Sequence, residues 1–169
     1  SSFDFFWLLI TNKFLNFIVY FSLLFALYTR HGATKTLNIF LFALILIGVV
    51  DQFTNLSKFF FERLRPCHNE QISLLSRLVS SECGGKFGFF SAHASNSFAI
   101  ATFFSFIFKH IKFLRIFILF LATLIAYSRV YIGVHYPLDV LIGASVGLSI
   151  SKLYIYFLKK YLKNIIFSY

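Results

Sequence analysis

Long apolar stretches determine what this chain can fold into. Five of them, at 14–28, 37–50, 98–108, 113–127 and 138–158, alternate with polar or charged segments. A helix needs roughly 20 apolar residues to cross the ~30 Å hydrocarbon layer of a membrane, or somewhat fewer where aromatic and basic residues anchor its ends. Only 13% of the 169 residues are charged, and 26 are Phe. The sequence therefore predicts an all-α integral membrane bundle of five to six transmembrane helices.

The first segment, 1–13, is too short to cross a membrane. It contains several aromatic residues, including Trp7, and ends at Lys13. Aromatic rings and lysines favour the boundary between lipid and water. We therefore expect an interfacial N-terminal helix, followed by one membrane-embedded domain, because 1–169 contains no internal repeat and no second unit.

Charge is distributed unevenly among the connections. If the five stretches cross in order, one side of the membrane carries basic residues and no acid, and every Asp and Glu falls on the other side. The basic set comprises Arg30, Lys35, Lys109, Lys112, Arg115, Lys159, Lys160 and Lys163. Basic loops face the cytoplasm. The connection 51–90 is then an extracytoplasmic loop that faces a periplasm or similar space, and the protein lies in the inner (plasma) membrane.

The net charge of +10 comes from basic residues scattered between apolar runs. This pattern suits membrane topology and contact with anionic lipids. There is no basic stripe or base-stacking motif, so nucleic acid is not an expected partner. The sequence makes no prediction of oligomeric state.

Cys67 and Cys83 both lie in the expected outward loop. An oxidising compartment would let them form a disulfide, whereas a reducing one would leave two free thiols. Two cysteines without an adjacent pair of histidines do not favour a metal site.

The first polar cluster is "KFFFERLRP", where Lys58 and Arg65 are seven positions apart. On one helix they would project from nearly the same face, and Pro66 would then end that helix. Two such cations could clamp a phosphate. Alternatively, they are basic residues of an interfacial helix whose charges reach up to water.

The second cluster is "SAHASNS". The stretch at 98–108 is short and must borrow these polar residues, which lipid tolerates only if they face a protein-lined cavity. Ser91 is a good N-cap, so backbone N–H groups at Ala92 and His93 could bind a phosphate. His93 could also donate a proton. The structural alternative is a helix cap and a hydrogen-bonded interior histidine.

The third cluster is "SRVYIGVHYPLD". Pro137 is placed to begin a helix, which puts His135 just before it and Asp139 in its first turn. Asp139 could fix one imidazole nitrogen and leave the other free to attack. Arg129 adds a cation. A purely structural hydrogen bond between His135 and Asp139 is the alternative.

Together these residues resemble the type 2 phosphatidic acid phosphatase family, the membrane lipid phosphate phosphatases. The family signature is Lys, six residues, Arg-Pro; then Pro-Ser-Gly-His; then Ser-Arg, five residues, His, three residues, Asp. Here the first part is complete at 58–66 and the third at 128–139, while the middle part reads Phe-Ser-Ala-His at 90–93. The two departures, Phe90 and Ala92, bear on substrate shape and on the phosphate-binding turn.

The resemblance implies that His135 attacks phosphorus to form a phosphohistidine while Asp139 orients the ring. His93 would protonate the leaving group and then activate water. The phosphoryl oxygens would be held by Lys58, Arg65, Ser91, Arg129 and the N–H groups of Ala92 and His93. No metal or cofactor is expected.

Substrates compatible with this resemblance are lipid phosphates: polyprenyl diphosphates, phosphatidylglycerol phosphate, phosphatidic acid or lipid A phosphates. Two alternatives remain. Vanadium haloperoxidases share the site but are soluble, and a non-catalytic lipid-phosphate binder or transporter could keep the pocket. We also expect an amphipathic helix over 69–82, lying on the membrane surface above the site.

Overall fold

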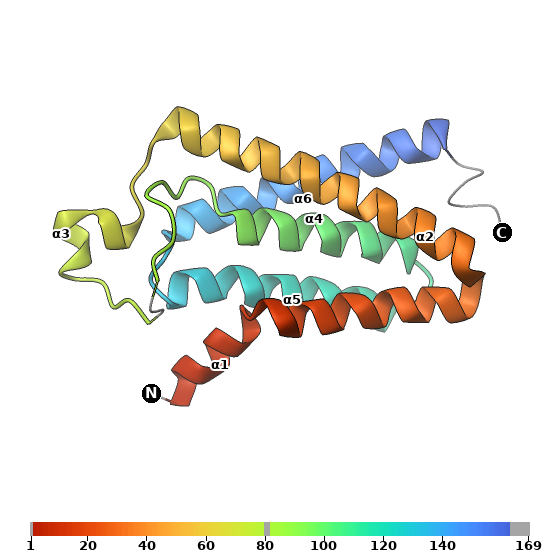
Figure 1. The fold of residues 1–169 in the computed structure, drawn as a ribbon, viewed down its shortest axis with the longest axis horizontal. Helices are drawn as coiled ribbons and strands as arrows, with labels where there is room; N and C mark the ends of the chain where they lie inside the picture. Colours follow the sequence, from red (N-terminus) through yellow and green to blue (C-terminus); the bar gives the residue numbers. More distant parts are fainter. Residues whose placement is uncertain (1, 80–81, 163–169) are drawn as a thin grey trace.

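The computed structural model describes residues 2–79 and 82–162. In chain order it contains α1 (Ser2–Ile10), α2 (Lys13–Phe61), the 3-10 turn η1 (Pro66–His68), α3 (Glu70–Ser73), α4 (Ala92–Ile107), α5 (Lys112–Tyr131) and α6 (Pro137–Tyr161). The long helices run roughly along one axis, and the loop that carries α3 lies at one end of the bundle (Figure 1). The predicted all-α membrane fold is confirmed.

Helix α2 is a hairpin rather than a straight rod. Its backbone turns at Gly32, where φ is 79° and ψ is 176°, a conformation that suits glycine because it has no Cβ. The two arms run back in opposite directions and diverge from this bend (Figure 1). Leu27 of the first arm and Leu46 of the second are buried in the same core. The stretches 14–28 and 37–50 thus form the two arms of this hairpin.

Within the described part of the chain, α2, α5 and α6 are long and apolar enough to cross a membrane. Helix α4 has 16 residues and is short for a span by itself. It begins at Ala92, so the polar "SAHASNS" does supply its first turns, as the sequence predicts. The number of membrane crossings stays a prediction. Lys163, expected on the basic side, lies outside the described residues.

The prediction that the loop begins at residue 51 is wrong. Helix α2 continues through 51–61 and ends at Phe61, with Glu62 in the left-handed region at φ 42°. The helix persists because its polar side chains find partners on α4: Thr54 Oγ1 lies 3.1 Å from Ser95 Oγ, and Asp51 accepts a hydrogen bond from Asn96. The prediction that Lys58 and Arg65 share one helix ended by Pro66 is therefore wrong.

The expected amphipathic helix at 69–82 is also wrong. Only Glu70–Ser73 is helical, capped by the Asn69 side chain. Leu74 and Leu75 follow in a turn and are 87% and 89% exposed. One helical turn is weakly stable by itself, and this one has no buried face to prolong it. Residues 80 and 81 lie outside the described part.

Helix α1 is separate from the spans and packs against α5. The Trp7 ring centroid lies 5.0 Å from that of Tyr127 and 5.4 Å from that of Tyr131. Asp4 accepts a hydrogen bond from the Tyr131 hydroxyl and pairs with Arg77. The N-terminal helix exists as expected, and its position at the membrane surface stays a prediction.

Helix α4 is central and packs against α5, α6 and α2. Its closest approach is to α6, where Gly143 and Gly147 lie one turn apart. A Cβ built on Gly143 would be 2.7 Å from the Ser91 carbonyl oxygen, and one on Gly147 would be 2.1 Å from the Ser95 carbonyl oxygen. Small residues at this spacing let membrane helices approach closely. The glycines therefore set the distance between α4 and α6.

We expect Gly147→Val to destabilise the protein by about 1–3 kcal/mol or more, because the new side chain meets backbone and the helices must separate. The measurement is thermal unfolding in detergent. Gly48→Ala is the matched control: its Cβ would meet nothing within 4 Å, so the unfolding temperature should be unchanged or raised. Equal stability of Gly147→Val and the native protein would contradict the packing argument.

Candidate active site

Two short extended segments meet at the end of the bundle. The Gly88 N–H donates to the Arg63 carbonyl oxygen at 2.9 Å, and the Arg65 N–H donates to the Lys86 carbonyl oxygen at 3.1 Å. Leu64 and Phe87 form the antiparallel bridge between these bonds. This pairing fixes the backbone from which both arginines extend toward the start of α6.

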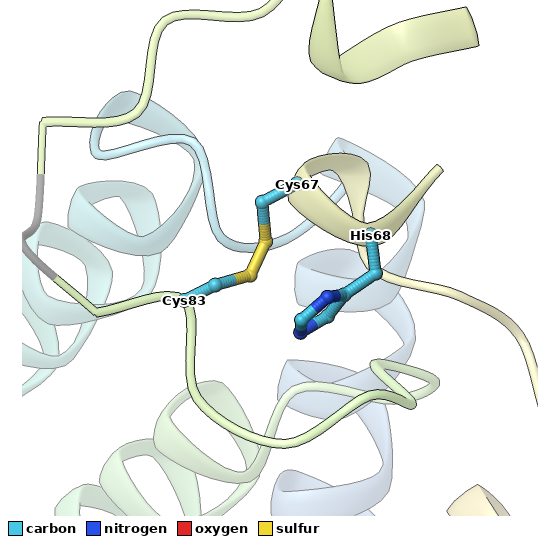
Figure 2. A group of neighbouring side chains, drawn as sticks. All are labelled: Cys67, His68 and Cys83. Atoms are coloured by element: carbon cyan, nitrogen blue, oxygen red, sulfur yellow. A yellow bond between two sulfur atoms is a disulfide. The ribbon is translucent and has the colours of Figure 1, made fainter. Parts of the chain in front are cut away.

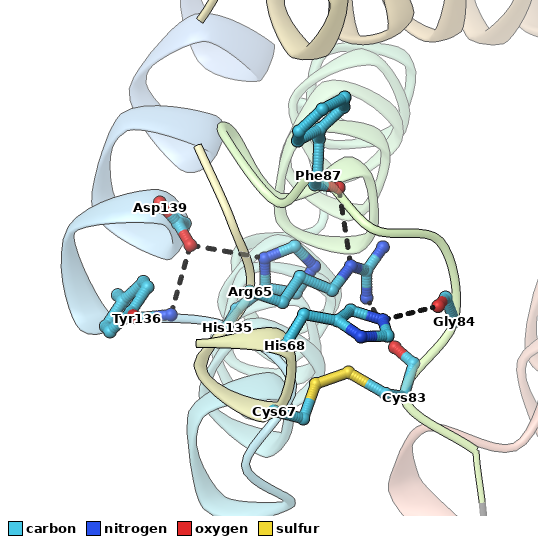
Figure 3. Close-up of a disulfide and its surroundings, with 9 residues drawn as sticks. All are labelled: Arg65, Cys67, His68, Cys83, Gly84, Phe87, His135, Tyr136 and Asp139. Atoms are coloured by element: carbon cyan, nitrogen blue, oxygen red, sulfur yellow. Dashed lines mark hydrogen bonds and ion pairs between the residues drawn. A yellow bond between two sulfur atoms is a disulfide. The ribbon is translucent and has the colours of Figure 1, made fainter. Parts of the chain in front are cut away.

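His135 and Asp139 form a buried pair at that start. The His135 N–H donates to the Arg129 carbonyl oxygen, and Pro137 begins α6 as predicted. Asp139 Oδ2 accepts from the Tyr136 N–H at 3.1 Å and lies 3.5 Å from His135 Nδ1 (Figure 3). The last distance is a close contact of the two groups rather than a hydrogen bond, and His135 Nδ1 has no hydrogen-bond partner among the described residues. The side chains of His135 and Asp139 are 2% and 0% exposed.

Arg63 completes the environment of Asp139. Its Nη1 lies 2.8 Å from Asp139 Oδ1, and its guanidinium lies over the Tyr136 ring, 4.4 Å from the centroid. A buried carboxylate needs such partners, because removal from water is costly. Sequence reasoning missed Arg63, which lies 76 positions from Asp139. The local signal was its position in "ERLRP", two residues before Arg65.

Arg65 is held by backbone oxygens of the loop that follows. Its Nη1 donates to the Cys83 carbonyl at 2.9 Å and its Nε to the Phe87 carbonyl at 3.4 Å (Figure 3). The structure joins Cys67 and Cys83 in a disulfide, with Cα atoms 6.3 Å apart. His68 lies beside this bond (Figure 2) and contacts the Gly84 carbonyl at 3.2 Å. The disulfide thus closes the loop next to the bonds that hold Arg65.

Cys67, His68 and Cys83 could together ligate a metal ion if both thiols were free. Metal ligation needs thiolates. In the disulfide, each sulfur is bonded to the other instead (Figure 2). This cluster therefore serves the loop as a cross-link.

Gly88 lies where Arg65 meets the His–Asp pair. A Cβ built on it would be 2.9 Å from Arg65 Cγ and 3.5 Å from both His135 Nδ1 and Asp139 Oδ2. Any larger residue would push Arg65 outward. The missing side chain therefore lets Arg65 pack directly beside His135.

Burial lowers the pKa of His135, and the nearby cations Arg65 and Arg129 lower it further, while Asp139 opposes them. The neutral imidazole is consequently favoured at neutral pH. A neutral ring with one nitrogen facing a carboxylate has the other nitrogen available as a nucleophile.

The predicted cations gather around this pair. Lys58, at the end of α2, is close enough to Arg65 for the two charges to interact. Arg129 Nη1 donates to Thr11 Oγ1 at 2.8 Å, whereas its buried Nε has no partner among the described residues. An unpaired guanidinium N–H suits an anionic oxygen.

The start of α4 is fixed to the start of α6. The Ser91 N–H donates to the Asp139 carbonyl oxygen at 3.0 Å, and Ser91 Oγ accepts from the Ala94 N–H, which confirms Ser91 as the N-cap. Ala92 and His93 follow in the first turn and line a cavity of about 470 Å³. The structure thus brings the three predicted clusters to one end of the bundle.

Known proteins are similar to this chain in sequence. The sequence model of the PAP2 superfamily matches residues 36–163. The lipid A 4'-phosphatase of Porphyromonas gingivalis is 35% identical over 158 residues, which cover 90% of this chain and 66% of that protein. The lipid A 4'-phosphatase of Bacteroides thetaiotaomicron is 44% identical over 86 residues, covering 50% of this chain and 38% of that protein.

A solved structure is also similar. It is the transmembrane PAP2-type phosphatidylglycerolphosphate phosphatase of Bacillus subtilis, with a TM-score of 0.71 and 25% identity. The match covers 95% of this chain and 79% of that one. The chain spans less than two thirds of the length of the two lipid A 4'-phosphatases.

We expect Arg63→Gln to lower stability by about 1–3 kcal/mol, because it leaves the buried Asp139 without its charged partner. Thermal unfolding in detergent measures this. Arg77→Gln is the matched control, since the Arg77 side chain is 65% exposed in its pair with Asp4 and exposed pairs contribute little. If the two variants unfold at the same temperature, Arg63 is not a support of the buried carboxylate.

Proposed function

The chain belongs to the PAP2 superfamily, and from that premise we propose that it hydrolyses a lipid phosphate monoester or diphosphate through a phosphohistidine on His135. The observation that carries this proposal is the buried His135–Asp139 pair packed against Arg65 at Gly88. A nucleophile, its orienting carboxylate and a phosphate-binding cation are adjacent there. The proposed reaction needs no metal ion or cofactor.

The proposed tautomer places the proton on Nδ1 of His135. That nitrogen faces Asp139 Oδ2 at 3.5 Å, and Nε2 would then have the free lone pair. In the proposed first step Nε2 forms a bond to phosphorus as the bond to the leaving oxygen breaks. Asp139 then stabilises the positive charge that develops on the ring.

Lys58, Arg65 and Arg129 would hold the phosphoryl oxygens during this transfer. Their charges balance the negative charge that spreads over these oxygens in the transition state. The unpaired Nε of Arg129 supports this role. Backbone N–H groups at the start of α4, at Ala92 and His93, and the Ser91 hydroxyl would add further donors.

His93 would act as the general acid and then as the base. It donates its proton to the leaving oxygen as that bond breaks. It then takes a proton from the water that attacks the phosphohistidine, which releases inorganic phosphate and restores neutral His135. The place of His93 in the lining of a cavity that also contains Thr11, the partner of Arg129, supports this role.

Among lipid phosphates, we favour the phosphate of a lipid A-like glycolipid. Two relatives named lipid A 4'-phosphatase match the chain at 35% and 44% identity. The relative of known structure is named for phosphatidylglycerol phosphate and is 25% identical. Phosphatidylglycerol phosphate is therefore the second candidate substrate.

We also propose that this end of the bundle faces the extracytoplasmic side of the inner membrane. The acids cluster toward this end and the lysines at 109, 159 and 160 toward the other. A cysteine at position 109 or 159 should react with an impermeant thiol reagent only after the cells are opened. Labelling of both positions in intact cells would reverse the orientation.

The first test is phosphate release from purified lipid phosphates in detergent with EDTA present. We expect the native protein to release phosphate and His135→Ala to lose at least about 10³-fold, because the nucleophile is gone. His68→Ala, which leaves the site intact, is the control. Equal release by the native protein and His135→Ala, or none from any lipid, would favour a non-catalytic binder.

The second test is the pH dependence of kcat/KM. His135 must be neutral to attack, and its pKa is lowered, so activity should persist below pH 6.5 and fall only at more acidic pH. Two substrates whose phosphates have different pKa values separate the enzyme's contribution from theirs. A shared acid limb centred above 6.5 would contradict the neutral histidine.

A further inference from the structure

One cavity has His93 in a lining of both polar and apolar residues, and we call it the polar cavity after the polar side chains in its wall. It has a volume of about 470 Å³ and lies between the first turns of α4 and the two arms of α2. Its polar lining comprises Thr11, Asn16, Asp51, His93, Asn96 and Ser97. Thr11 also accepts the hydrogen bond from Arg129, so this cavity borders the phosphate-binding cations.

An apolar cavity of about 700 Å³ continues from it along the hairpin of α2. The two cavities share Phe17, Tyr20, Ile47 and Ile100 in their walls. A molecule that enters from the apolar side would therefore reach His93 through the polar cavity. The apolar cavity, the polar cavity and the cations therefore follow one another as do the hydrocarbon, polar and phosphate parts of a lipid phosphate.

Asp51 is unexpected in this wall. It stands in an apolar arm of a membrane helix, where an acidic residue is costly and usually functional. Its Oδ1 accepts from Asn96 Nδ2 at 2.6 Å, which orients the amide. Asn96 Oδ1 is then left buried and without a partner in the described part of the chain. The pair therefore offers hydrogen-bond acceptors to the cavity.

The charge of this wall differs from that of the phosphate site. The cavity has no Lys or Arg among its lining residues, and a carboxylate repels phosphate. It is thus unsuited to a diphosphate leaving group. Carboxylate and amide oxygens in a wall without Lys or Arg suit hydroxyl or amide N–H donors instead.

We propose that Asp51 and Asn96 bind hydroxyl or amide N–H groups on the leaving alcohol of the substrate, as an N-acylated amino sugar provides. This rests on the proposed function, because the role of His93 assigns the cavity to the leaving group. The pair would then select a sugar-bearing lipid phosphate over phosphatidic acid, whose glycerol is esterified and offers no such donor. The acyl chains would lie in the apolar cavity.

Asp51→Asn tests this, because the new amide can still accept from Asn96 while the charge is lost. The probes are a monophosphorylated N-acylglucosamine lipid and phosphatidic acid with acyl chains of the same length. We expect kcat/KM for the sugar lipid to fall about 10- to 100-fold, the range for a hydrogen bond to a charged group, and kcat/KM for phosphatidic acid to change less than about 3-fold.

Thr54→Val is the matched control. It removes the Thr54–Ser95 hydrogen bond from the same α2–α4 interface, but Thr54 is fully buried and does not line the cavity. Any loss in this variant should be equal for both substrates. An equal loss for both substrates in Asp51→Asn would show that the Asp51–Asn96 bond only joins the helices, and would overturn the proposal.

A binding measurement separates this proposal from the proposed function. The probe is the dephosphorylated N-acylglucosamine lipid, measured by native mass spectrometry with the native protein, Asp51→Asn and Thr54→Val. Affinity should fall about tenfold or more in Asp51→Asn alone. This loss of affinity would support the subsite even if neither substrate were hydrolysed. Equal affinities in all three proteins would reject it.

Discussion

The close contact between α4 and α6 is the constraint on which the site depends. Gly143 and Gly147 bring the α6 backbone against the carbonyl oxygens of Ser91 and Ser95. In lipid, helices gain little from the hydrophobic effect when they associate, so close packing and hydrogen bonds must hold them. The bond from the Ser91 N–H to the Asp139 carbonyl then ties together the two helix starts. Because of this bond, the turn at 91–93 lies beside the turn at 135–139.

Asp139 is the buried negative charge at the start of α6. One of its oxygens accepts from Arg63, and the other lies near the Tyr136 N–H and His135. A fully buried carboxylate with these partners has little freedom to turn. For the reaction proposed above, this fixed carboxylate would keep the neighbouring imidazole in one place before substrate binds, which lowers the cost of a chemical step.

The sequence predicted the parts of this structure whose signals are local. The apolar stretches, the N-cap at Ser91 and the helix start at Pro137 are decided within a few residues, and the structure confirms them. The ordered signature from Lys58 to Asp139 led to the family, which the match over 36–163 confirms. The roles of the individual site residues stay predictions.

Features that depend on contacts between residues far apart in the sequence could not be predicted from local patterns. Asp51 looked like the start of a loop, because its partner Asn96 lies 45 positions away. Arg63 was not singled out, because its contact with Asp139, 76 positions away, exists only after folding. The apolar positions at 72–79 have helical spacing, but Leu74, Leu75 and Leu78 are exposed, and residues 74–79 are not helical.

The disulfide separates the base of its loop from the exposed tip. At the base, Cys83 accepts a hydrogen bond from Arg65 through its carbonyl, and Cys67 is two positions from that arginine. The tip around Leu74 and Leu75 lies beyond this covalent cross-link and makes no contact with the cation in the described structure. The tip can change in length or sequence at little cost to the chemistry, which makes it the natural place to graft a new recognition segment onto this scaffold.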